Sequence, residues 1–138
     1  MTSFTNRKFL RFWFPVILYS GIIFGVSSWP DLQAPSLGNI PFDKVCHILE
    51  YTLYGFLVAR ALLRTKGDWS RKGILFLTVM ISFFYGVSDE LHQIFVSGRT
   101  SSLTDLMADV IGAFIGGKIY FRKRDKQSLN ASLGREDI

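Results

Sequence analysis

The sequence predicts an all-α integral membrane protein, a bundle of four transmembrane helices with both termini in the cytoplasm. Three observations support this prediction. Of the 138 residues, 49% are hydrophobic and only 20% are charged. The charges are clustered, whereas a soluble domain of this length needs polar residues along each amphipathic element. The single cysteine excludes a disulfide framework or a cysteine-based zinc site, and the apolar content excludes a disordered chain.

The first predicted span is Phe12–Trp29, a tract of 18 residues without a charge. A helix of this length crosses most of a hydrocarbon core of about 30 Å. Pro15 lies near the start of the tract, where a missing amide donor matters least. A cleaved signal peptide is the alternative, but the tract is long for the apolar region of such a peptide. We therefore expect a retained membrane anchor.

Three further apolar tracts follow the first. They are Val45–Leu63, Gly73–Ser88 with an extension that reaches Val96, and Leu106–Phe121. Four spans of about 20 residues occupy ~80 residues and leave no room for a soluble domain. We expect residues 1–121 to form the transmembrane domain. Residues 122–138 are polar and charged, which predicts a flexible cytoplasmic tail.

The orientation follows from the basic residues. Of the 16 Lys and Arg, only Lys44 and Arg99 lie outside the N-terminal, middle and C-terminal segments that share one side of the membrane. We expect the protein to lie in the plasma membrane. The positive-inside rule then places that side of the protein in the cytoplasm. The net charge of +5 is then explained by topology and by contact with anionic lipid head groups, so it does not indicate nucleic-acid binding.

Polar residues gather at the opposite, outer ends of the spans. They recur three or four residues apart, so each set shares one helix face. The sets are Asp43, His47, Glu50 and Tyr54; Tyr85, Asp89 and His92; and Asp105, Asp109, Gly112 and Gly116. Ionisable groups at this depth are costly unless they face one another, water or a ligand. We expect the three stripes to line a polar cleft open to the outside, with the first span as a lipid-facing brace.

Short motifs around the last span add detail. Ser102-x-x-Asp105 is typical of a helix capping box, and the preceding loop holds Arg99 over the expected cleft. Gly112-x-x-x-Gly116 lets a neighbouring helix approach closely, and we expect this contact within the bundle. Cys46 is expected to be a small buried filler.

Together these residues form a recognisable pattern that extends over roughly residues 12–121. Its parts are Asp43-Lys44-x-x-His47-x-x-Glu50-Tyr51, Ser88-Asp89-Glu90-Leu91-His92-Gln93-x-Phe95 with Gly98-Arg99, and Asp105-x-x-x-Asp109-x-x-Gly112-x-x-x-Gly116. The pattern resembles the VanZ-like family of small bacterial membrane proteins. The chain departs from it at Asp109, where Asn is common, and at Ser97, where Pro is common; both departures concern local shape.

The resemblance implies a protein of the cell envelope. The family takes its name from a protein linked to resistance to the glycopeptide antibiotic teicoplanin, and most members have no established biochemical activity. Membrane lipid, a lipid-linked or cell-wall precursor and a glycopeptide are therefore the expected partners. Antibiotic resistance itself does not carry over to this chain, and the resemblance is silent on its oligomeric state.

Three kinds of function fit the predicted cleft. The first is an enzyme, in which carboxylates and imidazoles act as acid and base near neutral pH. Its candidate catalytic residues are Glu50, Asp89, Glu90, His92 and Asp105. Its candidate substrate-binding residues are His47, Gln93, Arg99 and Asp109. Among these, Arg99 has the planar guanidinium that holds a phosphate or carboxylate in a bidentate manner.

The second is a metal site, as in a metal-dependent enzyme acting on a phospholipid or cell-wall precursor. His47-x-x-Glu50 and Asp89-x-x-His92 each place an imidazole and a carboxylate on one helix face. These four residues are the candidate ligands of a divalent ion. No motif for an organic cofactor is present.

The third is a binding protein, or a proton or ion conduit, without bond chemistry. A purely structural role is the alternative to all three, with the polar groups pairing to hold the helices together. Interhelical polar contacts contribute only about 0.6 kcal/mol each in a membrane. So many charged groups therefore favour a function for the stripes as a whole.

Overall fold

The computed structural model describes residues 2–30, 42–65 and 68–136, and all regular elements among them are α-helices. The helices are α1 (Thr2–Ser27), α2 (Phe42–Thr65), α3 (Arg71–Gln93) and α4 (Leu103–Glu136). The prediction of an all-α protein with four helices is confirmed. Each predicted apolar tract lies within one helix, apart from its last residues in two cases. Ser28 and Trp29 follow α1, and the extension of the third tract reaches Val96 whereas α3 ends at Gln93.

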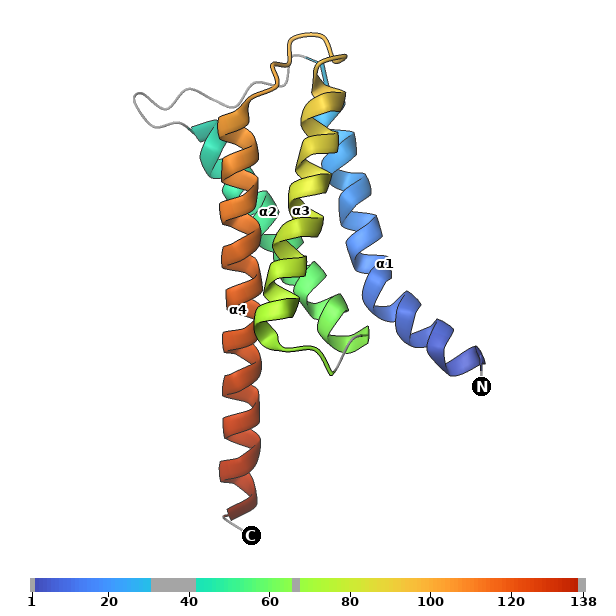
Figure 1. The fold of residues 1–138 in the computed structure, drawn as a ribbon, viewed down its shortest axis with the longest axis vertical. Coiled ribbons are helices and arrows are strands. Elements are labelled where there is room, and N and C mark those ends of the chain that lie inside the picture. The colour runs from blue at the N-terminus through green and yellow to red at the C-terminus, as the bar shows by residue number, and fades with distance from the viewer. Residues whose placement is uncertain (1, 31–41, 66–67, 137–138) are drawn as a thin grey trace.

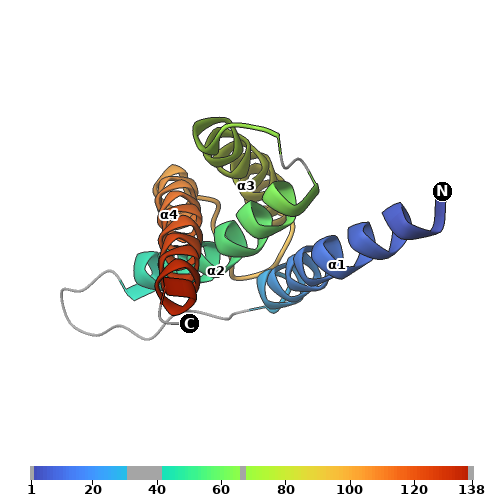
Figure 2. The same ribbon diagram turned by 90° about the horizontal axis from the view of Figure 1, so that it is seen from below.

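Successive helices run in opposite directions (Figure 1). The start of α1, the end of α4, the end of α2 and the start of α3 therefore lie at one end of the bundle, here called the terminal end (Figure 1). The connection 94–102 lies at the other end, here called the loop end. Seen along the bundle, α2 lies between α1 and α4, with α3 beside both α2 and α4 (Figure 2). The most extensive contact is between α2 and α4.

The backbones of α2 and α4 touch because glycines replace side chains where they cross. A Cβ atom at Gly116 would lie 2.0 Å from the carbonyl oxygen of Thr52. A Cβ at Gly55, from the opposite helix, would lie 2.4 Å from the carbonyl oxygen of Ala113. Only glycine permits such an approach. Gly112 and Gly116 thus pack within the bundle, as the sequence predicts.

Three tyrosines of α2 and α3 pack against one another near α1. The ring of Tyr54 lies 5.7 Å from that of Tyr51 and 5.1 Å from that of Tyr85. Tyr85 Oη donates a hydrogen bond of 2.5 Å to the carbonyl oxygen of Ser20, which ties α3 to α1. Tyr85 thus has a partner for its hydroxyl while its half-buried ring packs against Tyr54.

Three of the helices, α1, α2 and α3, contain segments long and apolar enough to cross a membrane. Their outward faces expose large apolar side chains, such as Ile17 and Phe84, which are 64% and 66% exposed. Contiguous exposed apolar surface of this kind is expected where a protein faces lipid. Among the described residues α4 does not meet the same measure, since Asp105, Asp109 and Lys118 interrupt its apolar half.

Two helices extend ten or more residues beyond the predicted spans. Helix α1 begins ten residues before the first tract, so that Pro15 lies inside it and not near its start. The helix bends along its length in Figure 1, as expected for an internal proline. Helix α4 continues through most of the predicted tail to Glu136.

One exposed ion pair joins this continuation of α4 to the start of α3. Arg71 donates from Nη1 and Nη2 to the two carboxylate oxygens of Asp125, at 2.9 and 2.6 Å. The guanidinium beside Asp125 lowers the pKa of that carboxyl below its usual value.

Candidate functional site

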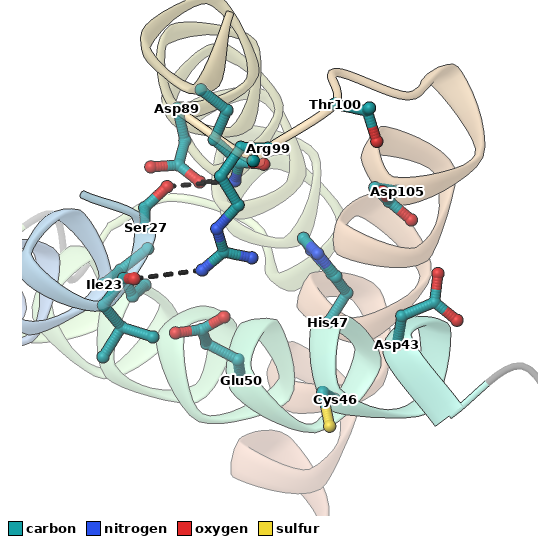
Figure 3. A pocket seen from close by; sticks show the side chains of 13 residues that line it. Ile23, Ser27, Asp43, Cys46, His47, Glu50, Asp89, Arg99, Thr100 and Asp105 are labelled. Carbon is teal, nitrogen blue, oxygen red and sulfur yellow. Dashed lines mark hydrogen bonds between the residues drawn. The ribbon is translucent and has the colours of Figure 1, made fainter. Parts of the chain in front are cut away.

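A pocket of about 490 Å³ lies at the loop end of the bundle. All four helices and the connection 94–102 contribute to its walls (Figure 3). Its lining residues are Ile23, Val26, Ser27, Asp43, Cys46, His47, Glu50, Asp89, Gln93, Gly98, Arg99, Thr100 and Asp105. The pocket is therefore partly apolar on the α1 side and rich in ionisable groups elsewhere.

Six of the nine residues that the sequence singles out line this pocket. They are His47, Glu50, Asp89, Gln93, Arg99 and Asp105. The other three, Glu90, His92 and Asp109, do not line it. The fold thus brings polar side chains of α2, α3 and α4 together, while the catalytic and binding roles assigned to them remain predictions.

His47 connects the pocket to a buried layer beneath it. Its Nδ1 lies 2.9 Å from Oδ1 of Asp109, which is only 1% exposed. This hydrogen bond joins α2 to α4 on the pocket side of their close backbone contact. A nearby Gly112, whose Cβ would lie 2.5 Å from the carbonyl oxygen of Ile48, allows the two side chains to meet.

Asp89 and Gln93 form the wall from α3. Gln93 Nε2 donates to Asp89 Oδ2 at 3.0 Å and to the hydroxyl of Ser27 at 2.9 Å. Both α3 side chains are buried, with 5% exposure each. The second hydrogen bond brings α1 into the site, so that α1 is more than the lipid-facing brace expected from the sequence.

Arg99 holds the connection 94–102 over the pocket. Its Nη2 donates to the carbonyl oxygen of Val26 at 3.0 Å, which again uses α1. In Figure 3 the side chain of Glu50 points toward the Arg99 guanidinium across the pocket. Among the described residues Arg99 forms no ion pair with Asp105, although both side chains line the pocket.

Asp105 instead pairs with Lys44, which also bonds to Asp43 at 2.8 Å. This arrangement replaces the capping box expected from Ser102-x-x-Asp105. The amide of Ser102 donates to Glu90 Oε2 at 2.7 Å, and the Ser102 hydroxyl accepts from the amide of Thr104. Because α3 supplies the carboxylate for Ser102, the side chain of Asp105 is free to reach α2.

His92 points away from the pocket. Its Nε2 lies 2.9 Å from the hydroxyl of Ser28, and its ring stacks on Phe24 at 4.4 Å. The predicted metal ligands His47, Glu50, Asp89 and His92 therefore do not converge as one set. The reason is that His92, three residues after Asp89, contacts Ser28 and Phe24 outside the pocket, whereas Asp89 lines the pocket.

A different set of potential metal ligands does converge. One ligand atom from each of His47, Glu90 and Asp109 lies within 4.8 Å of the others. We call these three residues the histidine–carboxylate cluster. Glu90 and Asp109 are buried, and His47 is half-buried at the floor of the pocket.

Several buried polar atoms around the pocket and the cluster have no hydrogen-bond partner within the part of the chain that the structure describes. They are Asp89 Oδ1, Glu90 Oε1, Arg99 Nε and Tyr51 Oη. Buried polar groups are nearly always paired, so such atoms need a reason. Water, an ion or a ligand group in the pocket would supply their partners.

Two kinds of site residue were missed in the sequence. The first kind is a serine at the end of α1 or just after it: Ser27 binds Gln93, and Ser28 binds His92. A hydroxyl within an apolar tract gives only a weak sequence signal. Cys46, expected to be buried, is exposed and lines the pocket. It lies one residue before His47, in the first turns of α2.

A family model described as VanZ/LLP1 matches residues 2–124. Neither the curated proteins nor the solved structures contain a match to this chain. The matched stretch contains every residue around the pocket and all three residues of the cluster. Together with three helices that can span a membrane, it identifies a membrane protein. The chain belongs to the VanZ/LLP1 family.

Proposed function

We propose that this protein spans the plasma membrane four times, with both termini in the cytoplasm, and binds a cell-envelope molecule in a pocket that opens outward. The ligand class is the polar part of a lipid-linked or cell-wall precursor, or of a glycopeptide. One observation carries the proposal. Ionisable side chains from α2, α3 and the connection 94–102 share one pocket, in which Asp89 Oδ1 and Arg99 Nε have no partner among the described residues.

The orientation is supported by the basic residues at the terminal end. A second hollow, of about 270 Å³, lies there between α2 and α4. It is lined by Phe56, Arg60, Arg64, Tyr120, Lys123, Arg124 and Gln127. Four cations without a carboxylate among them suit the anionic head groups of a cytoplasmic leaflet. The pocket at the loop end would then face the other side.

The charge balance of the pocket favours a particular ligand chemistry. Lys44 is already paired with Asp43 and Asp105, so Arg99 is the remaining Lys or Arg among the described residues around Glu50 and Asp89. A net acidic pocket attracts amino and hydroxyl groups more than a bare phosphate. Peptide and amino-sugar parts of cell-wall precursors and glycopeptides carry such groups. The apolar wall from α1 would contact an acyl or aromatic portion.

Cys46, the single cysteine, offers a direct test of orientation. A membrane-impermeant maleimide should label it in intact spheroplasts, because it lines the outward pocket. The control is Ser128→Cys in a Cys46→Ser background, since Ser128 is exposed on α4 beyond the terminal end. This variant should react only after permeabilisation. The reverse pattern of labelling would overturn the proposed orientation.

The same cysteine tests ligand binding. Teicoplanin or an undecaprenyl-linked wall precursor, added to the purified protein in detergent, should slow the labelling of Cys46. Glu50→Gln and Asp89→Asn should weaken this protection by about tenfold, the effect of roughly 1.4 kcal/mol of lost binding. Asp68→Asn, an isosteric change at an exposed position of the terminal end, is the matched control. Equal protection in all variants, or none in the unaltered protein, would refute binding of these ligands in the pocket.

A further inference from the structure

We propose that the histidine–carboxylate cluster of His47, Glu90 and Asp109 is a binding site for one divalent first-row transition-metal ion. This site differs from the metal ligands expected from the sequence, and it does not depend on the ligand proposed for the pocket. Each residue comes from a different helix, α2, α3 and α4. A bound ion would therefore join three of the four helices at one point.

The distances fit coordination after a small adjustment. One ligand atom of each residue lies within 4.8 Å of the other two. Nitrogen and oxygen ligands lie about 2.1 Å from such an ion, so two ligands of one ion are at most ~4.2 Å apart. Side-chain rotations that move the ligand atoms by a few tenths of an ångström close this difference. His47 and Asp109 are already in contact, at 2.9 Å.

The charges around the cluster also favour a cation. Glu90 and Asp109 are only 6% and 1% exposed, and buried carboxylates are costly without a counter-charge. The neighbouring basic side chains are committed elsewhere: Lys44 to two other carboxylates and Arg99 to a backbone carbonyl. Within the described ranges no salt bridge reaches Glu90, so one of the two buried carboxylates has no cationic partner.

A second, independent observation points to a ligand-binding role at this place. Tyr51 is 1% exposed, and its hydroxyl has no partner in the described part of the chain. That hydroxyl and Asp109 Oδ2 lie 3.5 and 3.0 Å from the point that a Cβ atom would occupy at Gly86. Oε1 of Glu90 is likewise buried and unpaired. An ion with its coordinated water would give these atoms partners.

The donor set indicates the kind of ion. One imidazole nitrogen and two carboxylate oxygens suit Mn²⁺, Fe²⁺ or Zn²⁺ better than an ion that prefers oxygen alone. Because His47 also lines the pocket, water from the pocket can complete the coordination. Glu90 is oriented by the amide of Ser102, as expected for a ligand held by a hydrogen bond to its second oxygen.

The test uses the full chain purified in detergent and treated with a chelator. Mn²⁺ or Zn²⁺ is then added alone, and the metal retained after desalting is measured by elemental analysis. We expect one ion per chain and a higher thermal midpoint in the presence of the ion. Glu90→Gln and Asp109→Asn should weaken binding by about tenfold or more. His92→Gln, at the other histidine, should leave the affinity unchanged.

Each outcome decides the proposal. Failure of the unaltered chain to retain either ion above the level of a chelated sample would overturn it. So would an equal loss of affinity in His92→Gln and Glu90→Gln. Circular dichroism shows whether Asp109→Asn folds. If it does not, the Co²⁺ absorption spectra of the unaltered protein and of Glu90→Gln are compared instead. An unchanged Co²⁺ spectrum in Glu90→Gln would then refute the site. None of these readouts depends on ligand binding in the pocket.

Discussion

Replacement of Gly116 by alanine tests whether the backbones of α2 and α4 are in contact. The added Cβ would lie 2.0 Å from the carbonyl oxygen of Thr52 and 2.7 Å from the amide nitrogen of Phe56. Real Cβ atoms keep about 3.0 Å from such atoms. The two helices must therefore separate by at least 1 Å at this point, because neither neighbour is the end of a flexible side chain.

The magnitude follows from two opposing effects. Overpacking of a tight contact costs about 1–3 kcal/mol or more, and here the conflict is between two backbones. The better helix propensity of alanine returns at most about 1 kcal/mol. Because the steric conflict at Gly116 is more severe than an added methylene in a side-chain core, we expect a net loss of about 2 kcal/mol or more.

The matched control is the same substitution at Gly21 in α1, where nothing lies within 4 Å of the added Cβ. Gly21→Ala should be neutral or should stabilise the protein by up to about 1 kcal/mol. Unfolding in mixed detergent micelles with increasing dodecyl sulfate, followed by circular dichroism, gives both free energies. Equal stability of the two variants would refute the close contact of α2 and α4.

Three further predictions concern other contacts. Tyr85→Phe removes the hydrogen bond to the Ser20 carbonyl and should lower the unfolding free energy by about 0.6 kcal/mol in the same assay; a neutral effect would contradict that bond. The carboxyl of Asp125 should titrate below 3.8 by NMR. Its contribution to stability should persist above pH 3.8 and disappear as the pH falls through the lower folded value, and Arg71→Gln should move the titration back toward 3.8. Gly86→Ala places a methyl 3.0 Å from a carboxylate oxygen of the histidine–carboxylate cluster. This variant should retain less Mn²⁺, as measured by elemental analysis. Unchanged retention would show that no Mn²⁺ ion binds beside Gly86.

The helices and the gathering of polar groups were predictable from local sequence patterns. Uncharged tracts of span length predict helices whatever their neighbours are. The spacing of Asp43, His47 and Glu50 places them on one face of α2, and all three line the pocket. The pair Gly112 and Gly116 of α4 likewise predicted a close helix contact, because small residues four apart in an apolar helix let a neighbouring backbone approach.

The pairing of individual side chains was not predictable in the same way. Asp89 and His92 share a stripe by their spacing, yet one faces the pocket and the other faces Ser28. A stripe on a helix is wide enough for its edges to face different neighbours, so the packing angle decides the outcome. The packing of α3 also explains why Glu90 belongs to the histidine–carboxylate cluster. The orientation of α3 that directs His92 toward α1 turns Glu90 toward α4.

The extension of α4 past the other helices has a practical consequence. Its 34 residues rise about 1.5 Å each, which gives a rod of ~51 Å against a hydrocarbon layer of ~30 Å. In the proposed arrangement, in which α4 crosses the membrane, roughly 20 Å of continuous helix lies outside the hydrocarbon layer. A fluorophore attached rigidly near Leu129, which is 58% exposed, would turn with that rod. Polarised emission from oriented bilayers would then report the tilt of α4 without any probe inside the membrane.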